Sequence, residues 1–506
     1  MLNLVEQKLP LDNRILLPVL TFLIGTIAVL TPKLFGALLS LALFIYLWKH
    51  KEQFVIFLLI YTPFEELILK MLPDASYAYV RFMWEGMLFV MMALMISENL
   101  FLSRRWKRSP IDIPALLFLG IWLVSTIDNS IPVISSLSVL KNIIRYVPIF
   151  YMIYNLKPDK IFLARIVRII ILVATIQSVI CIGQAIEGDS LVEIFRPKDV
   201  IIDGKVIRGP DIQLGSYHTR FTGSFARSND LGNYLTFAIC FTLAAYLKIG
   251  RKPRYVIAIM LMLIALFLSS SRISWISAFF AIGLILMYAR HRLRFAYFAG
   301  PVIILIIFVM GIATLDLKDT NEDFSVIDRF AYMFTGDYID IISNTGRLYA
   351  IQRVMPAVFR AEPLIGLGPG SFLKISEQMS DDVVYADAQR LGLDLEPLRY
   401  VHDVGFVALF VQAGLLGLLA VLWIFVRIYN RASKAMVSEK DKLTAAFLLG
   451  LLGFIVAVGI QNTASFNLLY RNQSLIIWVV LGLGTLLAGR ERARSSKLLT
   501  QKRFDI

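Results

Sequence analysis

Charged residues are scarce in this chain: Lys, Arg, Asp and Glu make up 17% of its 506 residues, whereas apolar residues make up 58%. The mean hydropathy of +0.70 excludes an ordinary soluble domain. The only two cysteines, Cys181 and Cys240, fall inside apolar runs. Neither a disulfide framework nor a cysteine metal site is therefore expected.

Several motifs of known chemistry are also missing from the sequence. It contains no Walker A loop, no zinc motif and no Gly-x-Ser-x-Gly elbow. No Asp-x-Asp pair stands at the start of an outer loop, where it could hold a divalent cation. Asp381 and Asp382 form an acidic pair, but nothing around them completes a metal site. We therefore predict a reaction that needs neither a metal nor a cofactor.

Long apolar runs, by contrast, recur along nearly the whole chain. Most of them are long enough to cross the ~30 Å hydrocarbon core of a bilayer, and one or two of the first four stay open because they are short or carry charges. They predict an all-α polytopic membrane protein with about 14 spans. We place them at 15–32, 34–49, 53–66, 79–97, 112–128, 133–156, 161–187, 229–247, 254–271, 272–290, 296–314, 404–427, 443–461 and 473–489.

The net charge of +14 is concentrated in alternate loops. These basic loops lie near residues 104–108, 157–165, 248–254, 290–294 and 434–442, and the C-terminal tail is basic as well. By the positive-inside rule, these loops and both termini are predicted to be cytoplasmic. The predicted spans satisfy this orientation without a contradiction.

Four regions follow from this topology. Residues 1–314 form an N-terminal bundle of about 11 spans, with an outer loop at 188–228. Residues 315–403 form a large, acidic extracytoplasmic loop, in which the segment from Arg347 has the pattern of an amphipathic surface helix. Residues 404–489 form the C-terminal spans, and 490–506 form a basic cytoplasmic tail. Any chemistry is therefore predicted on the outer face.

Three residues at the predicted outer face are candidates for that chemistry. His402 stands where the long polar loop ends and an apolar helix begins, although a histidine there can also simply cap the helix. Arg272 ends Ser269-Ser-Ser-Arg272 between two spans, either as an anion ligand or snorkelling toward headgroups. Arg347 follows a helix-start pattern at Asn344, and an ordinary solvated arginine is its alternative interpretation.

Further charged residues lie within or beside the membrane. Lys141 and Arg145 are four residues apart in one span, where a charge costs about 2.5–3.5 kcal/mol and generally faces a partner or a cavity. Arg145 could pair with Glu85, or the two cations could line a groove for a lipid headgroup. Arg220 precedes another span, where ordinary flanking charge is its alternative, and His218 beside it could compete with His402.

The stretch from about 215 to 430 resembles the O-antigen ligase and O-antigen polymerase family of bacterial membrane glycosyltransferases. The matching pieces occur in the order of the family's motifs. They are Arg220-Phe-Thr-Gly-Ser-Phe with Asn229, Ser269-Ser-Ser-Arg272, Gly346-Arg347, Glu362-Pro-Leu-Ile-Gly-Leu-Gly368-Pro-Gly370-Ser-Phe372, His402-Asp403 and Gly414-Leu-Leu-Gly417. One departure is Asp403, since the family usually has Asn or another small polar residue after the histidine.

The resemblance implies a GT-C-like helical bundle with the large outer loop between spans 11 and 12 over the active site. It implies a donor glycan on undecaprenyl diphosphate, held by Arg272, Arg347 and Arg220, and His402 acting on an acceptor glycan. Asp403, Lys141, Arg145, Gly368 and Gly370 would support this site. The implied partners are membrane lipids, a flippase and a chain-length regulator, and no nucleic acid.

The sequence therefore leaves several functions open, two of them enzymatic. A polysaccharide polymerase of the cytoplasmic membrane, metal-independent and inverting, is slightly favoured by the span count and the acidic outer loop. A ligase that moves the finished glycan to lipid, a wall polymer or a protein is the alternative enzyme. A transporter of an anionic solute, or a scaffold within an export complex, would be a protein of another class. The sugar repeat, the acceptor, the type of cell envelope and the oligomeric state stay open.

Overall fold

The computed structural model describes residues 42, 44–72, 74–101, 107–156, 158–197, 200–202, 205–207, 221–289, 347–371, 389–393 and 401–504. For some of these, including His402, it describes the backbone alone. The chain divides into two compact units, residues 1–55 and 56–506. In the first unit, the Tyr46 hydroxyl donates to Gln53 Oε1 at 2.6 Å, and Lys51 Nζ lies 3.8 Å from the centre of the Trp48 ring. Apart from α3, which contains the boundary between the units, the elements discussed below belong to the second unit.

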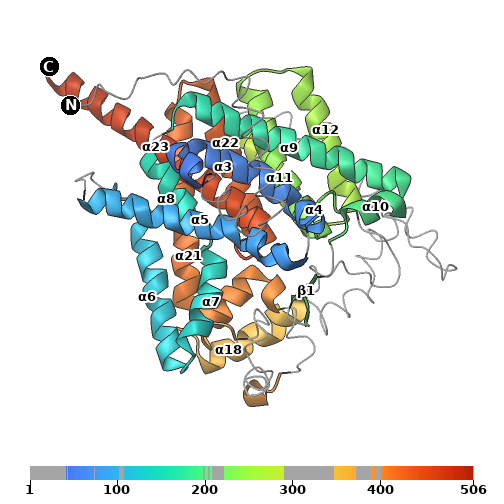
Figure 1. Cartoon of the computed structure of the whole chain (residues 1–506). Helices are drawn as coiled ribbons and strands as arrows, with labels where there is room; N and C mark the ends of the chain where they lie inside the picture. Colours follow the sequence, from blue (N-terminus) through green and yellow to red (C-terminus); the bar gives the residue numbers. More distant parts are fainter. Residues whose placement is uncertain are drawn as a thin grey trace, which may run out of the picture. The chain divides into compact units, whose positions relative to one another are not determined.

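Nearly all the described elements are helices, as predicted (Figure 1). In chain order they are α3 (Lys51–Tyr61), η1 (Thr62–Phe64), α4 (Glu65–Lys70), α5 (Asp74–Phe101), α6 (Asp112–Asp128), α7 (Val133–Ile144), α8 (Val147–Leu156), α9 (Lys160–Glu187), α10 (Asp189–Phe195), β1 (Val200–Ile202), β2 (Lys205–Ile207), α11 (Ser228–Lys248), α12 (Pro253–Leu268), α13 (Arg272–Tyr288), α17 (Arg347–Tyr349), η2 (Ala350–Val354), α18 (Met355–Ala361), η3 (Val401–Asp403), α21 (Gly405–Ser438), α22 (Lys442–Gln461) and α23 (Arg471–Phe504). The exception is β1–β2, a short antiparallel hairpin inside the predicted outer loop 188–228.

Six described helices are long and apolar enough to cross a membrane, or seven if the bent pair α7–α8 is one span. Two of the predicted spans, 15–32 and 296–314, and most of 34–49 lie outside the described residues. The segment 53–66 forms the short pieces α3, η1 and α4. Helices α6, α12 and α13 form where spans were expected but have only 16 or 17 residues. A polytopic helical membrane protein is confirmed, and the count of 14 stays a prediction.

The packed centre of the second unit is built around α22. This helix lies against α11 and α13, and its glycines let those helices come close. A Cβ at Gly450 would lie 2.7 Å from the Phe241 ring of α11, and one at Gly453 would lie 2.6 Å from Ile285 of α13. The ring of Phe237 packs on that of Phe454 with centroids 4.6 Å apart. Small residues at a helix contact are the usual means of close packing inside a bilayer.

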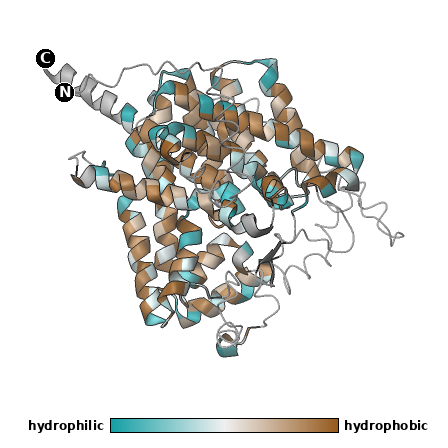
Figure 2. Cartoon of the chain, in the orientation of Figure 1, coloured by the Kyte–Doolittle hydropathy of each residue, from teal (hydrophilic) through white to brown (hydrophobic). Residues whose placement is uncertain are grey.

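The peripheral helices expose apolar side chains. On α6, Leu116 is 67% exposed and Ile127 is 70% exposed. Figure 2 shows the helical ribbons predominantly in the hydrophobic colour, with hydrophilic residues interspersed. In water such surfaces would be unfavourable, whereas lipid tails cover them without cost. The pattern fits helices that face a bilayer.

The predicted cytoplasmic loops come together at one end of the helices. Lys160 Nζ contacts Asp441 at 2.9 Å, which joins the α8–α9 loop to the α21–α22 loop. Arg490 of α23 donates to the carbonyl of Pro158 at 2.9 Å. The Tyr154 hydroxyl donates to the carbonyl of Arg108 at 3.3 Å, which adds the loop before α6. The contacts are consistent with one common side for these basic loops.

Candidate functional site

His402 lies in the short helix η3, directly before α21, as the sequence indicated. The structure describes its backbone, and its side chain lies outside the described part. The start of α21 is held against the loop after α22: the Phe406 amide donates to the carbonyl of Asn462 at 3.2 Å. A Cβ at Gly405 would lie 2.4 Å from Asn462 Oδ1, so a larger residue would have to displace that side chain. Backbone contacts thus fix the turn that carries His402.

Asp403, the next residue, contacts Arg347, a second predicted site residue. Its Oδ2 lies 3.6 Å from Nη2 of Arg347, which is the first residue of α17. Its Oδ1 accepts a hydrogen bond of 3.0 Å from the Tyr470 hydroxyl. The Arg347 side chain is 38% exposed, so its guanidinium keeps part of its surface open to solvent. The Gly346-Arg347 and His402-Asp403 motifs therefore meet in space.

Tyr470 extends this network to Arg227. Arg227 Nη1 donates to the Tyr470 hydroxyl at 2.9 Å, and its guanidinium carbon lies 5.1 Å from the centre of the Tyr470 ring. Burial, together with the negative charge of Asp403, raises the pKa of Tyr470, so the phenol stays neutral and can donate to that carboxylate. In the next turn, Gln473 Nε2 donates to the buried Asp230 at 2.9 Å.

Arg272 is the first residue of α13, as the sequence predicted. A chain of buried polar groups holds this helix start. The Ser271 and Ser274 hydroxyls lie 2.7 Å apart, and the Ser274 hydroxyl donates to Asn233 Oδ1 at 2.8 Å. Asn233 Nδ2 in turn donates to Asn467 Oδ1 at 3.2 Å. Asn467 belongs to the loop that also contacts the start of α21, so one loop ties the Arg272 and His402 segments together.

Helix α21 is broken at Gly414, where the backbone has φ +64°. The segment after α18 supplies the hydrogen bonds that the break leaves unmade. The amides of Leu415 and Leu416 donate to the carbonyls of Pro363 and Leu364 at 2.9 and 3.2 Å. In return, the carbonyl of Val411 accepts from the Leu367 amide at 2.7 Å. Buried backbone polar groups are nearly always paired, and here a second chain segment replaces the helix ladder.

Glycines allow this close contact between two backbones. A Cβ at Gly366, which has φ +74°, would lie 2.5 Å from the carbonyl oxygen of Val411. A Cβ at Gly368 would lie 2.9 Å from the Ile131 side chain. The Gly370 amide donates to Gln412 Oε1 at 3.3 Å. Gly368 and Gly370, predicted as supporting residues, thus help build the joint between the long loop and α21.

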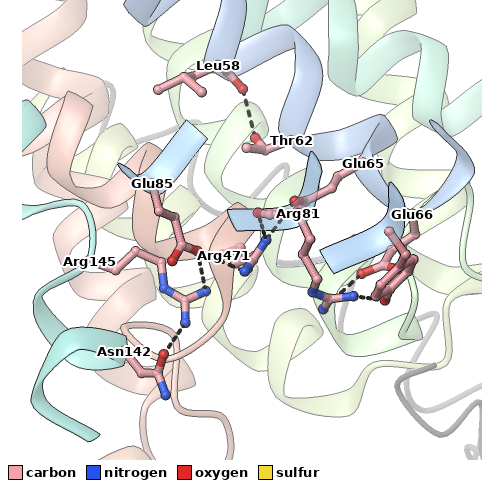
Figure 3. A network of polar contacts seen from close by, with 10 residues as sticks. Leu58, Thr62, Glu65, Glu66, Arg81, Glu85, Asn142, Arg145 and Arg471 are labelled. Carbon is pink, nitrogen blue, oxygen red and sulfur yellow. Dashed lines mark hydrogen bonds and ion pairs between the residues drawn. The ribbon is translucent and has the colours of Figure 1, made fainter. Parts of the chain in front are cut away.

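Arg145 lies at the break between α7 and α8, whose axes bend by 49°. Its Nη1 lies 3.2 Å from Glu85 of α5, and both side chains are buried. Its Nη2 donates to Asn142 Oδ1 at 2.6 Å (Figure 3). The ion pair considered from the sequence is present. Lys141, its neighbour, places Nζ 5.1 Å from the centre of the Phe82 ring.

Arg471 is the residue of this cluster that sequence reasoning missed. It lies between two carboxylates, 2.8 Å from Glu65 and 3.0 Å from Glu85, and also donates to the carbonyl of Arg81 at 2.6 Å (Figure 3). Arg81 itself pairs with Glu66 at 3.4 Å, and not with Glu85 on its own helix. The signal in the sequence was the position of Arg471 at the edge of the last apolar run. Its partners lie about 400 residues away in the chain, which no local pattern reveals.

Two candidates cannot be placed. Arg220, predicted to bind the donor, and His218 lie outside the described residues. Of the remaining candidates, Arg347 and the backbone of His402 meet through Asp403. The start of α13, which carries Arg272, is linked to the Asn467 loop through Ser274 and Asn233. Arg145 belongs to a separate cluster on α5, α7 and α23.

The comparisons with known proteins bear on these motifs. No curated protein matches the chain. Residues 257–422 match a family model described as O-antigen ligase. This segment contains five of the six pieces on which the resemblance rested, including Arg272, Arg347 and His402. The first piece, Arg220-Phe-Thr-Gly-Ser-Phe with Asn229, lies before the matched segment. The match supports the resemblance over this segment: residues 257–422 are similar to the O-antigen ligase family.

Proposed function

We propose that this protein is a glycosyltransferase that moves a glycan from undecaprenyl diphosphate to a sugar hydroxyl on the outer face of the cytoplasmic membrane. The observation that carries the proposal is the meeting of Arg347 with the His402 turn through Asp403. The start of α13, which carries Arg272, is hydrogen-bonded through Asn233 to Asn467, in the loop that also contacts the start of α21. Residues far apart in the chain are thus gathered at one end of α21, opposite the basic loops.

The chemistry requires stabilisation of a departing diphosphate. In the transfer, the bond from the anomeric carbon to the diphosphate oxygen breaks and a bond to the acceptor oxygen forms. Arginine forks suit the oxygens of a phosphate, and Arg272 and Arg347 would bind the charge that develops there. Because the leaving group is a stable anion, the step needs neither a general acid nor a metal. In-line attack opposite the diphosphate would invert the anomeric centre.

The acceptor hydroxyl must lose its proton as it attacks. The His402 imidazole would take that proton, since an unperturbed histidine has a pKa of ~6.5 and can act as a base near neutral pH, contributing ~10²–10⁴ in rate. Asp403 would act as a positioning residue, because its carboxylate contacts Arg347 and Tyr470. The Asp that replaces the family's usual Asn thus supplies a charge that holds Arg347 near the turn.

Within the family, we favour a polymerase over a ligase, with the flippase and chain-length regulator as partner proteins. The decisive experiment incubates purified protein in detergent with an undecaprenyl-diphosphate oligosaccharide in EDTA. A ladder of longer lipid-linked glycans is the expected product. Transfer of the glycan to an added lipid, wall polymer or protein acceptor would instead identify a ligase. The absence of transfer to every acceptor would contradict the proposal.

Broken helices favour one candidate of another class, a transporter of an anionic solute. The described residues contain two such breaks, at Arg145 and at Gly414. Both are filled by protein, however: Glu85 pairs with Arg145, and the Pro363–Leu367 backbone occupies the break at Gly414. Flux of a labelled anion into proteoliposomes, with no glycan transfer, would support the transporter.

A further inference from the structure

A groove lies at the end of α21 opposite His402. Its volume is about 520 Å³, and a single stripe of α21 forms most of its wall. The opposite side is Ala488 and Gly489 of α23, and a Cβ at Gly489 would meet nothing within 4 Å. The volume falls in the ~300–1,000 Å³ range of small-molecule sites. The small residues of α23 leave room for a ligand between the two helices.

The chemistry of the groove changes along its length. Its cationic part contains Arg427, Arg431 and Lys434, which lie three or four residues apart and thus share one face of α21. Its apolar part contains Trp423 and Val426, which are 43% and 53% exposed. None of the described residues that line the groove is acidic. A ligand that fits would have a negatively charged end and an apolar end.

The cationic part lies where lipid headgroups would be. Asp441, just beyond α21, contacts Lys160, and Arg490, just after Gly489, contacts Pro158. These contacts join loops that the positive-inside rule assigns to the cytoplasm. Tryptophan is enriched at the boundary between hydrocarbon and headgroups, and Trp423 lies one helical turn toward the bilayer from Arg427. The guanidinium carbon of Arg427 lies 5.8 Å from the centre of the Trp423 ring.

We propose that this groove binds one anionic phospholipid of the cytoplasmic leaflet. Arg427, Arg431 and Lys434 hold its phosphate, and Trp423 and Val426 contact an acyl chain. Basic residues at a membrane surface attract anionic lipid in general, but a concave site between two helices adds a defined place for one headgroup. The site is separate from the proposed glycan transfer and does not depend on it.

Quenching of Trp423 by brominated lipid tests the proposal. The full chain is placed in vesicles of phosphatidylcholine that contain increasing brominated phosphatidylglycerol, and the signal of Trp423 is obtained by difference from Trp423→Phe. We expect saturable quenching by phosphatidylglycerol and much weaker quenching by brominated phosphatidylcholine. Equal quenching by both lipids would overturn the proposal. Full competition by inorganic phosphate at the concentration of the lipid would also overturn it, because the site would then bind free phosphate.

A matched pair of charge variants separates the groove from general surface charge. Replacing Arg427, Arg431 and Lys434 by Gln should weaken phosphatidylglycerol binding on the order of a hundredfold, at about fivefold for each cation. The control replaces Arg251, Lys252 and Arg254 by Gln, which removes the same charge from exposed positions of the α11–α12 loop and the start of α12. Equal weakening in both triple variants would contradict a specific site. If the groove variant does not fold, Lys434→Gln alone should still weaken binding several-fold.

Discussion

The carboxylate of Asp403 contacts Arg347 through an ion pair and Tyr470 through a hydrogen bond. Arg347 is more than one-third exposed, so the ion pair by itself contributes less than ~1 kcal/mol. Its importance is geometric, because it directs a guanidinium of the long loop toward the turn that carries His402. Tyr470 fixes the carboxylate from the other side, and Arg227 fixes Tyr470.

Substitutions of Asp403 should separate its charge from its hydrogen bond. Asp403→Asn keeps an acceptor for Tyr470 and should lower kcat/KM for glycan transfer less than about fivefold. Asp403→Ala leaves the Tyr470 hydroxyl without this acceptor, which costs ~1–3 kcal/mol and should lower kcat/KM by about ten- to a hundredfold. Tyr470→Phe keeps the Asp403 carboxylate but removes the hydroxyl that bonds Asp403 and Arg227, and its kcat/KM should fall at least as far as that of Asp403→Ala. An inactive Asp403→Asn protein would show instead that the negative charge itself is required.

The sequence predicted individual site residues only where a charged or titratable residue stands beside an apolar run. A histidine before an apolar helix, and arginines at two helix starts, stand out in a chain with few charges, and the structure places them at those starts. Tyr470 carried no such mark, and the position of Arg471 at the edge of the last apolar run does not indicate its partners. Both gain their partners by long-range packing, Tyr470 with Asp403 and Arg471 with Glu65.

At the scale of elements, the joint between the long loop and α21 is the feature that sequence periodicity could not predict. Gly414-Leu-Leu-Gly417 lies in a continuous apolar run and looks like an uninterrupted span. Its break depends on the Pro363–Leu367 backbone, which comes from another part of the chain. The spacing of apolar residues predicts which face of a helix is buried. It does not predict where a distant segment replaces the hydrogen bonds of that helix.

Substitution of Gly414 should break this joint. A Cβ there would lie 2.2 Å from the carbonyl group of Leu364, and the positive φ adds strain for any other residue. We expect Gly414→Ala to destabilise the protein by ~2 kcal/mol or more, measured as a lower Tm in detergent. Gly459→Ala in α22 is the control, because nothing lies within 4 Å of its Cβ, and its Tm should be unchanged or slightly higher. Equal Tm values for both variants would argue against the joint.

The buried ion cluster joins α5, α7 and α23. Arg145→Met would leave Glu85 with Arg471 alone, and Glu85→Gln would leave Arg145 without its carboxylate. Removal of one partner of a buried pair typically costs ~3–5 kcal/mol, so each change should lower Tm by several degrees. The double variant should lose less than the sum of both, because no uncompensated charge remains between them.

Lys141→Met is the matched control for this cluster. Its ammonium contacts the Phe82 ring, an interaction worth ~1 kcal/mol, so its effect on Tm should be smaller. If Arg145→Met proved as harmless as Lys141→Met, the cluster would not be a structural tie. The sequence left a headgroup groove as the alternative interpretation of Arg145, and that outcome would favour it.

At the scale of the whole molecule, the central structural prediction is that the site and the basic loops lie on opposite sides of a membrane. Single-cysteine labelling tests it, since both native cysteines are buried. Lys440→Cys and Arg360→Cys place thiols at exposed positions of the α21–α22 loop and of α18. In intact cells without an outer membrane barrier, an impermeant maleimide should label the Arg360 position and not the Lys440 position. Labelling of both, or the reverse pattern, would contradict the topology.

The central functional claim is transfer of a lipid-linked glycan with His402 as the base. The most direct measurement compares release of undecaprenyl diphosphate by the purified native protein, His402→Ala and His50→Ala in EDTA. His50 lies in the first unit, so its loss controls for removal of a histidine. We predict that His402→Ala lowers the rate at pH 7 by ~10²–10⁴, while His50→Ala retains native activity. Equal activity of all three proteins would contradict the role of His402, and the absence of release by the native protein would contradict the enzyme itself.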